Sequence, residues 1–410
     1  MNLDAQHPLS SGLTTASRLV RAYQGARPDV TPVWFMRQAG RSLPEYRDLR
    51  VGTQMLDACL DPEMASEITL QPVRRHKVDA GIFFSDIVVP LRLVGVDVEI
   101  VPGRGPVLGR PTRTAADVDA LVALDPAVLD DALAPIREAV KRTTDELGQT
   151  PLIGFAGAPF TLAAYLVEGG PSKDHIKART LMHSDPDSWA RLMAWTAEVT
   201  GRFLRAQVLA GASAAQLFDS WAGALSLDDY ARYVAPASAQ AIAHVRDLTF
   251  AVPAVPAAET AEVADAPTPA APAAGDAGVG GATAVPSQAE PVLRNVPVVH
   301  FGVGTGELLK EMYDIGADVV GVDYRVPLDE ANRRLGGVVP LQGNVDPALL
   351  AAPWPVLEAH VLDVLERGRS APSHVLNLGH GVPPETDPAV LTRVVELVHD
   401  AAPAASVDRP

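Results

Sequence analysis

The stretch TPVWFMRQAGRSLPEYR, residues 31–47, holds the unit from which the fold can be deduced. It opens with the apolar run PVWFM (32–36), which has the length and composition of a buried strand. Two arginines, Arg37 and Arg41, follow with Gly40 between them, and a helix is expected after them. A short apolar strand that ends in polar side chains and continues into a helix is the repeating unit of α/β proteins.

Seven further apolar runs repeat this pattern, and amphipathic stretches such as 187–212 and 387–402 lie between them. Strands that alternate with helices indicate parallel pairing with right-handed crossovers. Eight such units predict an α/β fold, namely a single (β/α)8 TIM-type barrel spanning residues 1–410, with an open doubly wound sheet as the competing architecture. VDVEIV (96–101) is expected to add a short hairpin. The eight runs are PVWFM (32–36), AGIFFSD (80–86), LIGFAGAP (152–159), AAQLFDS (214–220), VPVVHFG (296–302), DVVGVDY (318–324), VVPLQGN (338–344) and HVLNLGH (374–380).

Residues 251–293 differ from the rest of the chain, because they contain no aromatic residue, no Lys and no Arg. Such a composition buries too little apolar surface to offset the entropy of ordering the segment. We therefore predict a disordered Ala/Pro-rich insertion within the barrel domain. A partner-binding role is the alternative, and the absence of any aromatic or basic motif disfavours it.

The overall composition restricts the classes of function. The formal net charge of −16 argues against broad binding to nucleic acid or to an anionic membrane surface, although a local basic pocket can still bind an anionic small molecule. The single cysteine, Cys59, excludes an intrachain disulfide and CxxC metal sites. No apolar run is long enough to cross a bilayer, and the first residues lack a signal-peptide h-region. A cytoplasmic location is expected.

Polar residues gather where the predicted strands end. In a parallel barrel the chemistry is carried by the carboxyl ends of the strands, so these residues are the candidates for a site. They are Arg37, Arg41, Asp86, Tyr165, Asp219, Ser220, Asp323, Asn344, Asp346, Asn377 and His380.

Six motifs in this order, RQAGRSLPEYR, FFSDI, GFAGAPFTLAAYLVEGG, QLFDSWAG, LQGNVDP and LNLGHGVPPETDP, resemble the uroporphyrinogen decarboxylase family, from about residue 8 to 400. The resemblance implies one (β/α)8 barrel that forms a homodimer and uses neither a metal nor an organic cofactor. It implies an enzyme of porphyrin and haem biosynthesis, a carboxy-lyase. Such an enzyme removes the four acetate carboxyl groups of uroporphyrinogen III as CO2 and gives coproporphyrinogen III.

On this resemblance, Arg37 and Arg41 bind substrate carboxylates, and backbone N–H groups from Gln38 to Gly40, through Ala39, add donors. A planar guanidinium binds a carboxylate through two parallel hydrogen bonds. The alternative interpretation is that both arginines form ion pairs with Glu45 or Asp48.

The resemblance also makes Asp86 the acceptor for pyrrole N–H groups and the stabiliser of a cationic ring. A cap on the following helix is the alternative for this residue. Tyr165, Ser220 and His380 are implied substrate contacts. Their alternatives are a core tyrosine, a helix cap and a loop histidine. Arg37 is a candidate proton donor, but its high pKa makes it a poor acid, so the donor stays unassigned.

Four other functions compete with this interpretation. VVHFGVGTGELLKEM imitates a nucleotide-binding or S-adenosylmethionine-binding turn, but it leaves the other strand ends unexplained. A zinc-dependent methyltransferase of the same barrel family needs thiolate ligands that Cys59 alone cannot supply. A Ser220–His380 hydrolase lacks the GxSxG elbow. A non-catalytic tetrapyrrole-binding protein is the last alternative, and only turnover distinguishes it.

Overall fold

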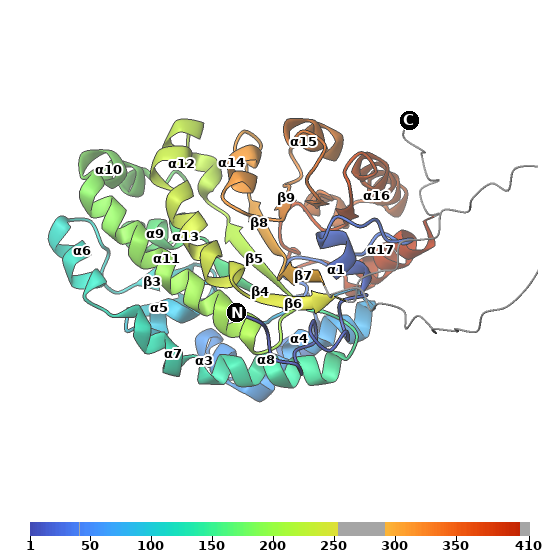
Figure 1. The fold of residues 1–410 in the computed structure, drawn as a ribbon, viewed down its shortest axis with the longest axis horizontal. Coiled ribbons are helices and arrows are strands. Elements are labelled where there is room, and N and C mark those ends of the chain that lie inside the picture. The colour runs from blue at the N-terminus through green and yellow to red at the C-terminus, as the bar shows by residue number, and fades with distance from the viewer. Residues whose placement is uncertain (41, 253–291, 402–410) are drawn as a thin grey trace, which may run out of the picture.

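The computed structural model describes residues 1–40, 42–252 and 292–401. Seven strands form one parallel sheet in which each strand pairs with the next one along the sequence. A doubly wound sheet would reverse its strand order, so this order confirms the barrel-type fold. Figure 1 shows helices lying around the outside of these strands. The strands of the sheet are β1 (Gly81–Ile82), β4 (Leu152–Gly157), β5 (Ala214–Asp219), β8 (Val298–Gly302), β9 (Val319–Gly321), β10 (Leu341–Gln342) and β11 (His374–Val375).

The first predicted strand, 32–36, lies between β11 and the start of β1. Leu376 donates its N–H to the Pro32 carbonyl (2.9 Å), and Asp79 donates its N–H to the Val33 carbonyl (2.9 Å). This run forms only an isolated bridge, between Val33 and Leu376, and no regular strand. A proline lacks the N–H that a longer ladder would need. The run nevertheless occupies the eighth position of the barrel.

The predicted long helices are present. α11 (Pro186–Leu209) corresponds to the stretch 187–212. It begins at N-cap Asp185, whose carboxylate accepts the Ser188 N–H at 3.1 Å, and Pro186 occupies its first turn. α17 (Pro388–Asp400) corresponds to the stretch 387–402, of which residue 402 lies outside the described residues. Both helices bury one apolar face against the barrel.

The remaining helices fill the connections between strands. They are α1 (Arg18–Tyr23), α2 (Pro44–Leu49), α3 (Met55–Leu60), α4 (Pro62–His76), α5 (Val89–Leu93), α6 (Ala115–Val122), α7 (Leu129–Ala132), α8 (Ala134–Leu147), α9 (Pro159–Glu168), α10 (Ile176–Ser184), α12 (Leu227–Tyr233), α13 (Ala235–Arg246), α14 (Leu309–Asp314), α15 (Leu328–Arg334) and α16 (Trp354–Gly368), with 3-10 turns η1 (Pro126–Val128), η2 (Ala222–Ala224) and η3 (Pro347–Ala351).

Two antiparallel pairs stand outside the main sheet. The predicted hairpin at 96–101 is confirmed as β2 (Val98–Val101) paired with β3 (Gly105–Leu108). The second pair is β6 (Thr249–Val252) with β7 (Val292–Asn295), and it lies beside the N-terminus (Figure 1), where Asn2 bridges Thr249.

The β6–β7 pair corrects the ends of the predicted insertion. Residues 251 and 252 pair with 293 and 292, so these four residues extend a ladder instead of belonging to a disordered segment. The β-branched Val252 and Val292 favour extended backbone, and the buried Phe250 anchors the ladder to the core. The other residues of the predicted insertion, 253–291, lie outside the described residues.

We expect deletion of residues 255–290 to leave kcat and the melting temperature nearly unchanged. Val252 and Val292, which flank the deletion, are paired with each other, so a short loop is enough to join them as a hairpin. Differential scanning calorimetry and a turnover assay on the deleted protein check this. A melting temperature several degrees lower would show that the segment packs against the barrel.

His374 should make the fold less stable in mild acid. It is buried at the start of β11, its Nε2 lies 2.7 Å from the Gly343 carbonyl, and burial lowers its pKa to about 4. The folded protein therefore binds a proton on the His374 imidazole more weakly than the unfolded chain does, where histidine titrates near pH 6.5. Stability is complete above that pH and falls as the pH drops towards 4, by roughly 2 kcal/mol at pH 5.

Urea unfolding at pH 7.5 and pH 5 measures this loss. A His374→Gln variant keeps a donor for the Gly343 carbonyl but cannot titrate, so its stability should depend less on pH. An equal pH dependence in the two proteins would contradict the assignment.

Candidate active site

Arg37 lies at the mouth of the barrel, meaning the face formed by the carboxyl ends of the strands. It follows the run 32–36 directly, it is exposed, and its backbone has a φ of 63°. Few residues other than glycine adopt this left-handed conformation, and those that do cluster at functional sites. A Cβ on Gly381 would lie 2.5 Å from Arg37 Cδ, so the arginine side chain packs directly over this glycine. Arg41 lies outside the described residues.

Gln38 connects the first run to β1. Its side-chain oxygen accepts the Phe35 N–H (2.9 Å), and its side-chain nitrogen donates to the Ala80 carbonyl (2.9 Å). Its own backbone N–H donates to the Phe35 carbonyl (3.0 Å). The Gln38 backbone donor is thus used within the protein, which leaves the N–H groups of Ala39 and Gly40 as the candidates for a ligand.

One alternative partner of the arginines is already paired. The Glu45 carboxylate accepts two hydrogen bonds from Arg75, at 2.7 and 2.8 Å. This bonding lowers the pKa of Glu45, and it draws the carboxylate towards α4. The pairing of Glu45 with Arg75 therefore argues against Glu45 as the partner of Arg37.

Asp86 lies just beyond β1, half-buried at the mouth. Its Oδ1 accepts the Val88 N–H at 3.0 Å and so supports the turn before α5. The N-cap residue of α5 is Val88, which makes no side-chain cap bond, so Asp86 is a turn residue and not the helix cap that the alternative interpretation expected. The negative charge of Asp86 reaches its neighbours, since it contributes to raising the pKa of both Cys59 and Tyr165.

Tyr165 lies on α9, within electrostatic reach of Asp86 and Arg37. The pKa of its phenol is raised to about 12, mainly by burial and in part by the Asp86 carboxylate, while the Arg37 guanidinium opposes both effects. The phenol is therefore neutral at physiological pH and able to donate a hydrogen bond. The three side chains come from three successive strand–helix units, and Asp86 and Arg37 both act electrostatically on Tyr165.

The Tyr165 ring is held in an aromatic stack. It lies on Trp221, with ring centroids 3.8 Å apart, and Trp221 lies on His175 at 4.3 Å. Trp221 and His175 were missed by the sequence reasoning. Trp221 had a signal, because it stands next to Ser220 in the QLFDSWAG motif, whereas His175 precedes α10 and had none.

Ser220 directly follows β5 and is half-buried beside Trp221. The N-cap of the following turn η2 is Trp221, so Ser220 does not take the capping position. Its neighbour Asp219 is fully buried away from the mouth, where its Oδ1 accepts a hydrogen bond from Thr161 Oγ1 at 2.9 Å. Asp219 thus joins β5 to α9, the helix that carries Tyr165.

His380 lies in the loop after β11. Its Nδ1 accepts the Gly381 N–H at 2.8 Å, which places the proton of the neutral ring on Nε2. Partial exclusion of water lowers the pKa of His380, and the positive charges of Arg37 and Arg325 lower it further. A neutral imidazole with a free Nε2–H can donate to a carboxylate at the mouth.

The other polar strand ends have structural contacts. Asn344 donates to the carbonyls of Asp323 (2.8 Å) and Val326 (2.6 Å). Asn377 accepts the Met36 N–H at 2.9 Å, and Asp346 caps η3. These contacts fix the loops of the mouth.

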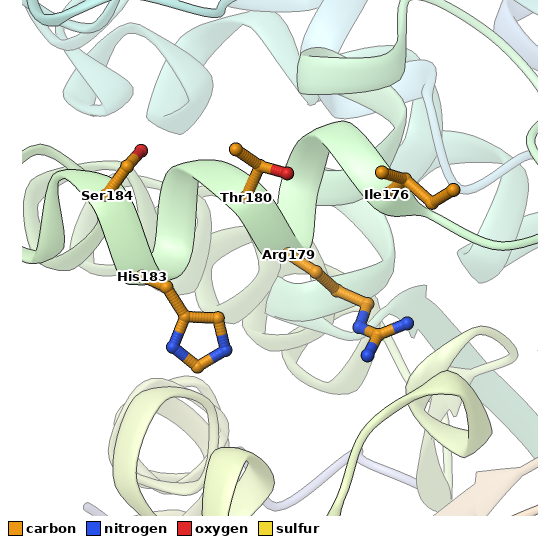
Figure 2. Close-up of a pocket in the computed structure, with 5 residues that line it drawn as sticks. All are labelled: Ile176, Arg179, Thr180, His183 and Ser184. Atoms are coloured by element: carbon orange, nitrogen blue, oxygen red, sulfur yellow. The ribbon is translucent and has the colours of Figure 1, made fainter.

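A separate hollow of about 500 Å³ lies along α10 (Figure 2). Ile176, Arg179, Thr180, His183 and Ser184 line it, and His183 reaches to within 3.4 Å of Asp229 on α12. None of the predicted site residues lines this hollow. The chemistry at the strand ends, and not the presence of a hollow, therefore identifies the candidate site.

The mouth combines a guanidinium, a carboxylate, a neutral phenol and a neutral imidazole. The guanidinium and imidazole can hold carboxylates, while Asp86 can stabilise a cation that forms between them. Among residues 1–40, 42–252 and 292–401, no group of three or more His, Cys, Asp or Glu side chains could hold a metal ion. Fold and site together indicate a TIM-type barrel protein whose mouth suits a small molecule bearing carboxylates.

The comparisons with known proteins identify the family. The family model "Uroporphyrinogen decarboxylase (URO-D)" matches residues 14–261 and 281–401. The uroporphyrinogen decarboxylase of Leifsonia xyli is 70% identical over 97% of this chain and 98% of its own. That of Arthrobacter sp. (strain FB24) is 60% identical over 96% of this chain and 99% of its own. The chain belongs to the uroporphyrinogen decarboxylase family.

A solved structure shares the fold at low identity. A methyltransferase from Methanosarcina mazei superposes with a TM-score of 0.70 and covers 94% of this chain and 98% of its own, at 19% identity. At that identity the likeness shows the barrel fold alone, and the methyltransferase alternative gains nothing from it.

Proposed function

We propose that this protein removes the four acetate carboxyl groups of uroporphyrinogen III as CO2 and releases coproporphyrinogen III. Membership of the uroporphyrinogen decarboxylase family, at 70% identity to one relative over nearly the full length, carries this conclusion. The chemistry of the mouth agrees with this function independently. A substrate with eight carboxylates needs cationic side chains to bind it, and a reaction through a cationic ring needs a carboxylate to stabilise that ring. The non-catalytic tetrapyrrole-binding alternative predicts binding without turnover.

Each acetate arm reacts in three steps. A proton adds to the pyrrole carbon next to the arm and makes the ring a cation. The bond between the methylene and the carboxylate breaks, CO2 leaves, and the electron pair moves into the cationic ring. A proton then adds to the exposed methylene carbon to form the methyl group, and the proton on the ring carbon leaves, which restores the neutral pyrrole.

Asp86 is the residue that stabilises the positive charge formed in these steps. Its carboxylate at the mouth accepts hydrogen bonds from pyrrole N–H groups, and its charge stabilises the ring cation more than the neutral substrate. Asp86 acts electrostatically on the phenol of Tyr165, for which we propose a contact near the centre of the macrocycle. This proximity supports a position of Asp86 near the same centre.

The substrate arms are held by the cationic and neutral donors of the mouth. Arg37 and Arg41 bind carboxylates, with backbone N–H groups of Ala39 and Gly40 beside them and Gln38 fixing this turn. Tyr165 donates near the centre of the macrocycle. Ser220 and His380 complete the set as donors to acetate or propionate oxygens.

No helix in the part of the chain that the structure describes is long and apolar enough to cross a membrane. We place the enzyme in the cytoplasm as a homodimer. Its reaction, as written above, calls on no metal and no organic cofactor.

The deciding experiment is incubation of the pure protein with uroporphyrinogen III without oxygen, followed by oxidation and separation of the porphyrins by carboxyl number. Successive products with seven, six, five and four carboxyl groups are expected. Tight binding without any loss of carboxyl groups would instead support the non-catalytic alternative.

A further inference from the structure

Arg325 is a further arginine at the mouth, and it is not among the site residues that the sequence predicted. It follows β9 in the loop 323–326, which Asn344 fixes through its bonds to the carbonyls of Asp323 and Val326. The loop after β11 lies directly against this one, because a Cβ on Gly379 would collide with the backbone of Tyr324. Arg325 is thus placed by a firmly held loop and not by a flexible surface turn.

The Arg325 guanidinium is anchored from the protein side. It pairs with the Asp323 carboxylate and lies over the Tyr324 ring, with Cζ 4.5 Å from the ring centroid. The same carboxylate accepts the N–H groups of Gly304 (2.6 Å) and Arg325 itself (3.1 Å). The Asp323 side chain is 1% exposed, whereas that of Arg325 is 49% exposed. A guanidinium held in this way keeps further N–H donors directed to solvent, in a plane fixed by the ring below it.

Arg325 and Arg37 flank one histidine. Arg37 packs on Gly381 and the Arg325 loop packs on Gly379, so the two arginines approach His380 from its two neighbours in the chain. Both positive charges lower the pKa of His380, which agrees with this placement. The His380 imidazole, a hydrogen-bond donor, therefore lies between two cations, Arg37 and Arg325, at the mouth.

We propose that Arg325 binds a side-arm carboxylate of the tetrapyrrole, as a second carboxylate-binding position across His380 from Arg37. This inference rests on the proposed function, which supplies a ligand with eight carboxylates. A preformed, ring-supported guanidinium loses little conformational entropy when it forms two hydrogen bonds to a carboxylate. A chain with a net charge of −16 also needs such local cations to hold a polyanion.

The alternative role of Arg325 is to neutralise the buried Asp323 carboxylate. A double-mutant cycle separates the two roles, using Arg325→Gln, Asp323→Asn and the double variant. In the Asp323→Asn background there is no buried Asp323 charge to neutralise. If neutralisation were the only role of Arg325, replacing it in this background would not change the affinity. Arg333→Gln is the matched control, because Arg333 is an exposed arginine ion-paired with Glu330 on the next helix, α15.

The readout is fluorescence-quenching affinity for uroporphyrin, the oxidised and unreactive form with eight carboxylates, together with KM and kcat for uroporphyrinogen III. We expect Arg325→Gln to weaken binding about tenfold in both backgrounds, with KM raised more than kcat is lowered. Arg325→Lys should lie between, and Arg333→Gln should bind like the wild type. Circular dichroism and melting temperature confirm folding.

The outcomes separate this inference from the proposed function. If adding Arg325→Gln to Asp323→Asn changes the affinity less than twofold while the wild type decarboxylates its substrate, the carboxylate role of Arg325 is wrong and the function stands. If the wild type does not decarboxylate but its affinity depends on Arg325, the binding position stands and the function is wrong. A wild type that neither binds nor reacts overturns both.

Discussion

An Asp86→Asn variant should fold normally and lose on the order of 10²–10³ in kcat, the typical effect of removing one preorganised electrostatic partner of a transition state. Asparagine keeps the size of the side chain and can still accept the Val88 N–H, so the turn before α5 survives. What disappears is the negative charge. Because that charge stabilises the ring cation more than the neutral substrate, kcat should fall with KM changed less.

The chain offers a matched control for the turn itself. Asp125 accepts the Ala127 N–H at 2.9 Å, in the same two-residue geometry that Asp86 makes with Val88 at 3.0 Å. Asp125→Asn removes a charge from an equivalent turn at the start of η1, and we expect full activity from it. Asp86→Glu keeps the charge but moves it by one methylene, so it should also lose activity. A folded Asp86→Asn enzyme with normal kcat would leave only the turn-forming role of this residue.

The sequence predicted the fold because hydrophobic runs and helical spacing alternate regularly. Seven of the eight predicted runs contain strands of the sheet, in chain order. The remaining run, 32–36, which is the first in the chain, lies in its predicted place but forms only one bridge. Pro32 lacks an N–H, and the Gln38 side chain accepts the Phe35 N–H in place of a strand ladder. Strand formation at such a position depends on tertiary hydrogen bonds that no local pattern contains.

The grouping of the candidate residues was predictable where residue type and strand end coincide, and less so elsewhere. Arg37, Asp86, Tyr165 and His380 interact electrostatically at one mouth, although they lie far apart in the sequence. Asp219 has the same sequence signature but is buried behind the sheet, because alternate residues of a strand point to opposite faces.

The stack of Tyr165, Trp221 and His175 joins segments whose contact depends on how α9 and α10 pack against β5. Periodicity within one segment carries no information about such contacts. Arg325 was not predicted from the sequence for a similar reason. Its position beside His380 follows from the packing of the loop after β9 against the loop after β11.

Arg37→Ala should lower kcat/KM by about 10- to 100-fold, since a charged hydrogen bond contributes roughly 1.5–3 kcal/mol. The effect should appear mainly in KM if Arg37 only holds a carboxylate, and in kcat as well if it also positions the reacting arm. Arg37→Lys should restore part of the loss, because an ammonium group keeps the charge but cannot form the paired hydrogen bonds of the guanidinium.

The unusual backbone of Arg37 calls for a control of its own, and Lys77 provides it. Lys77 is also an exposed cation with a positive φ, 57° against 63° for Arg37, at the C-terminal end of α4. Lys77→Ala therefore removes one positive charge from the same backbone conformation at a distance from the candidate site. Steady-state kinetics and melting temperature are measured on all three variants. We expect Lys77→Ala to keep its kcat/KM, so that the loss in Arg37→Ala belongs to carboxylate binding and not to backbone strain. Equal activity of Arg37→Lys and the wild type would show that charge alone suffices and that the paired hydrogen bonds contribute nothing.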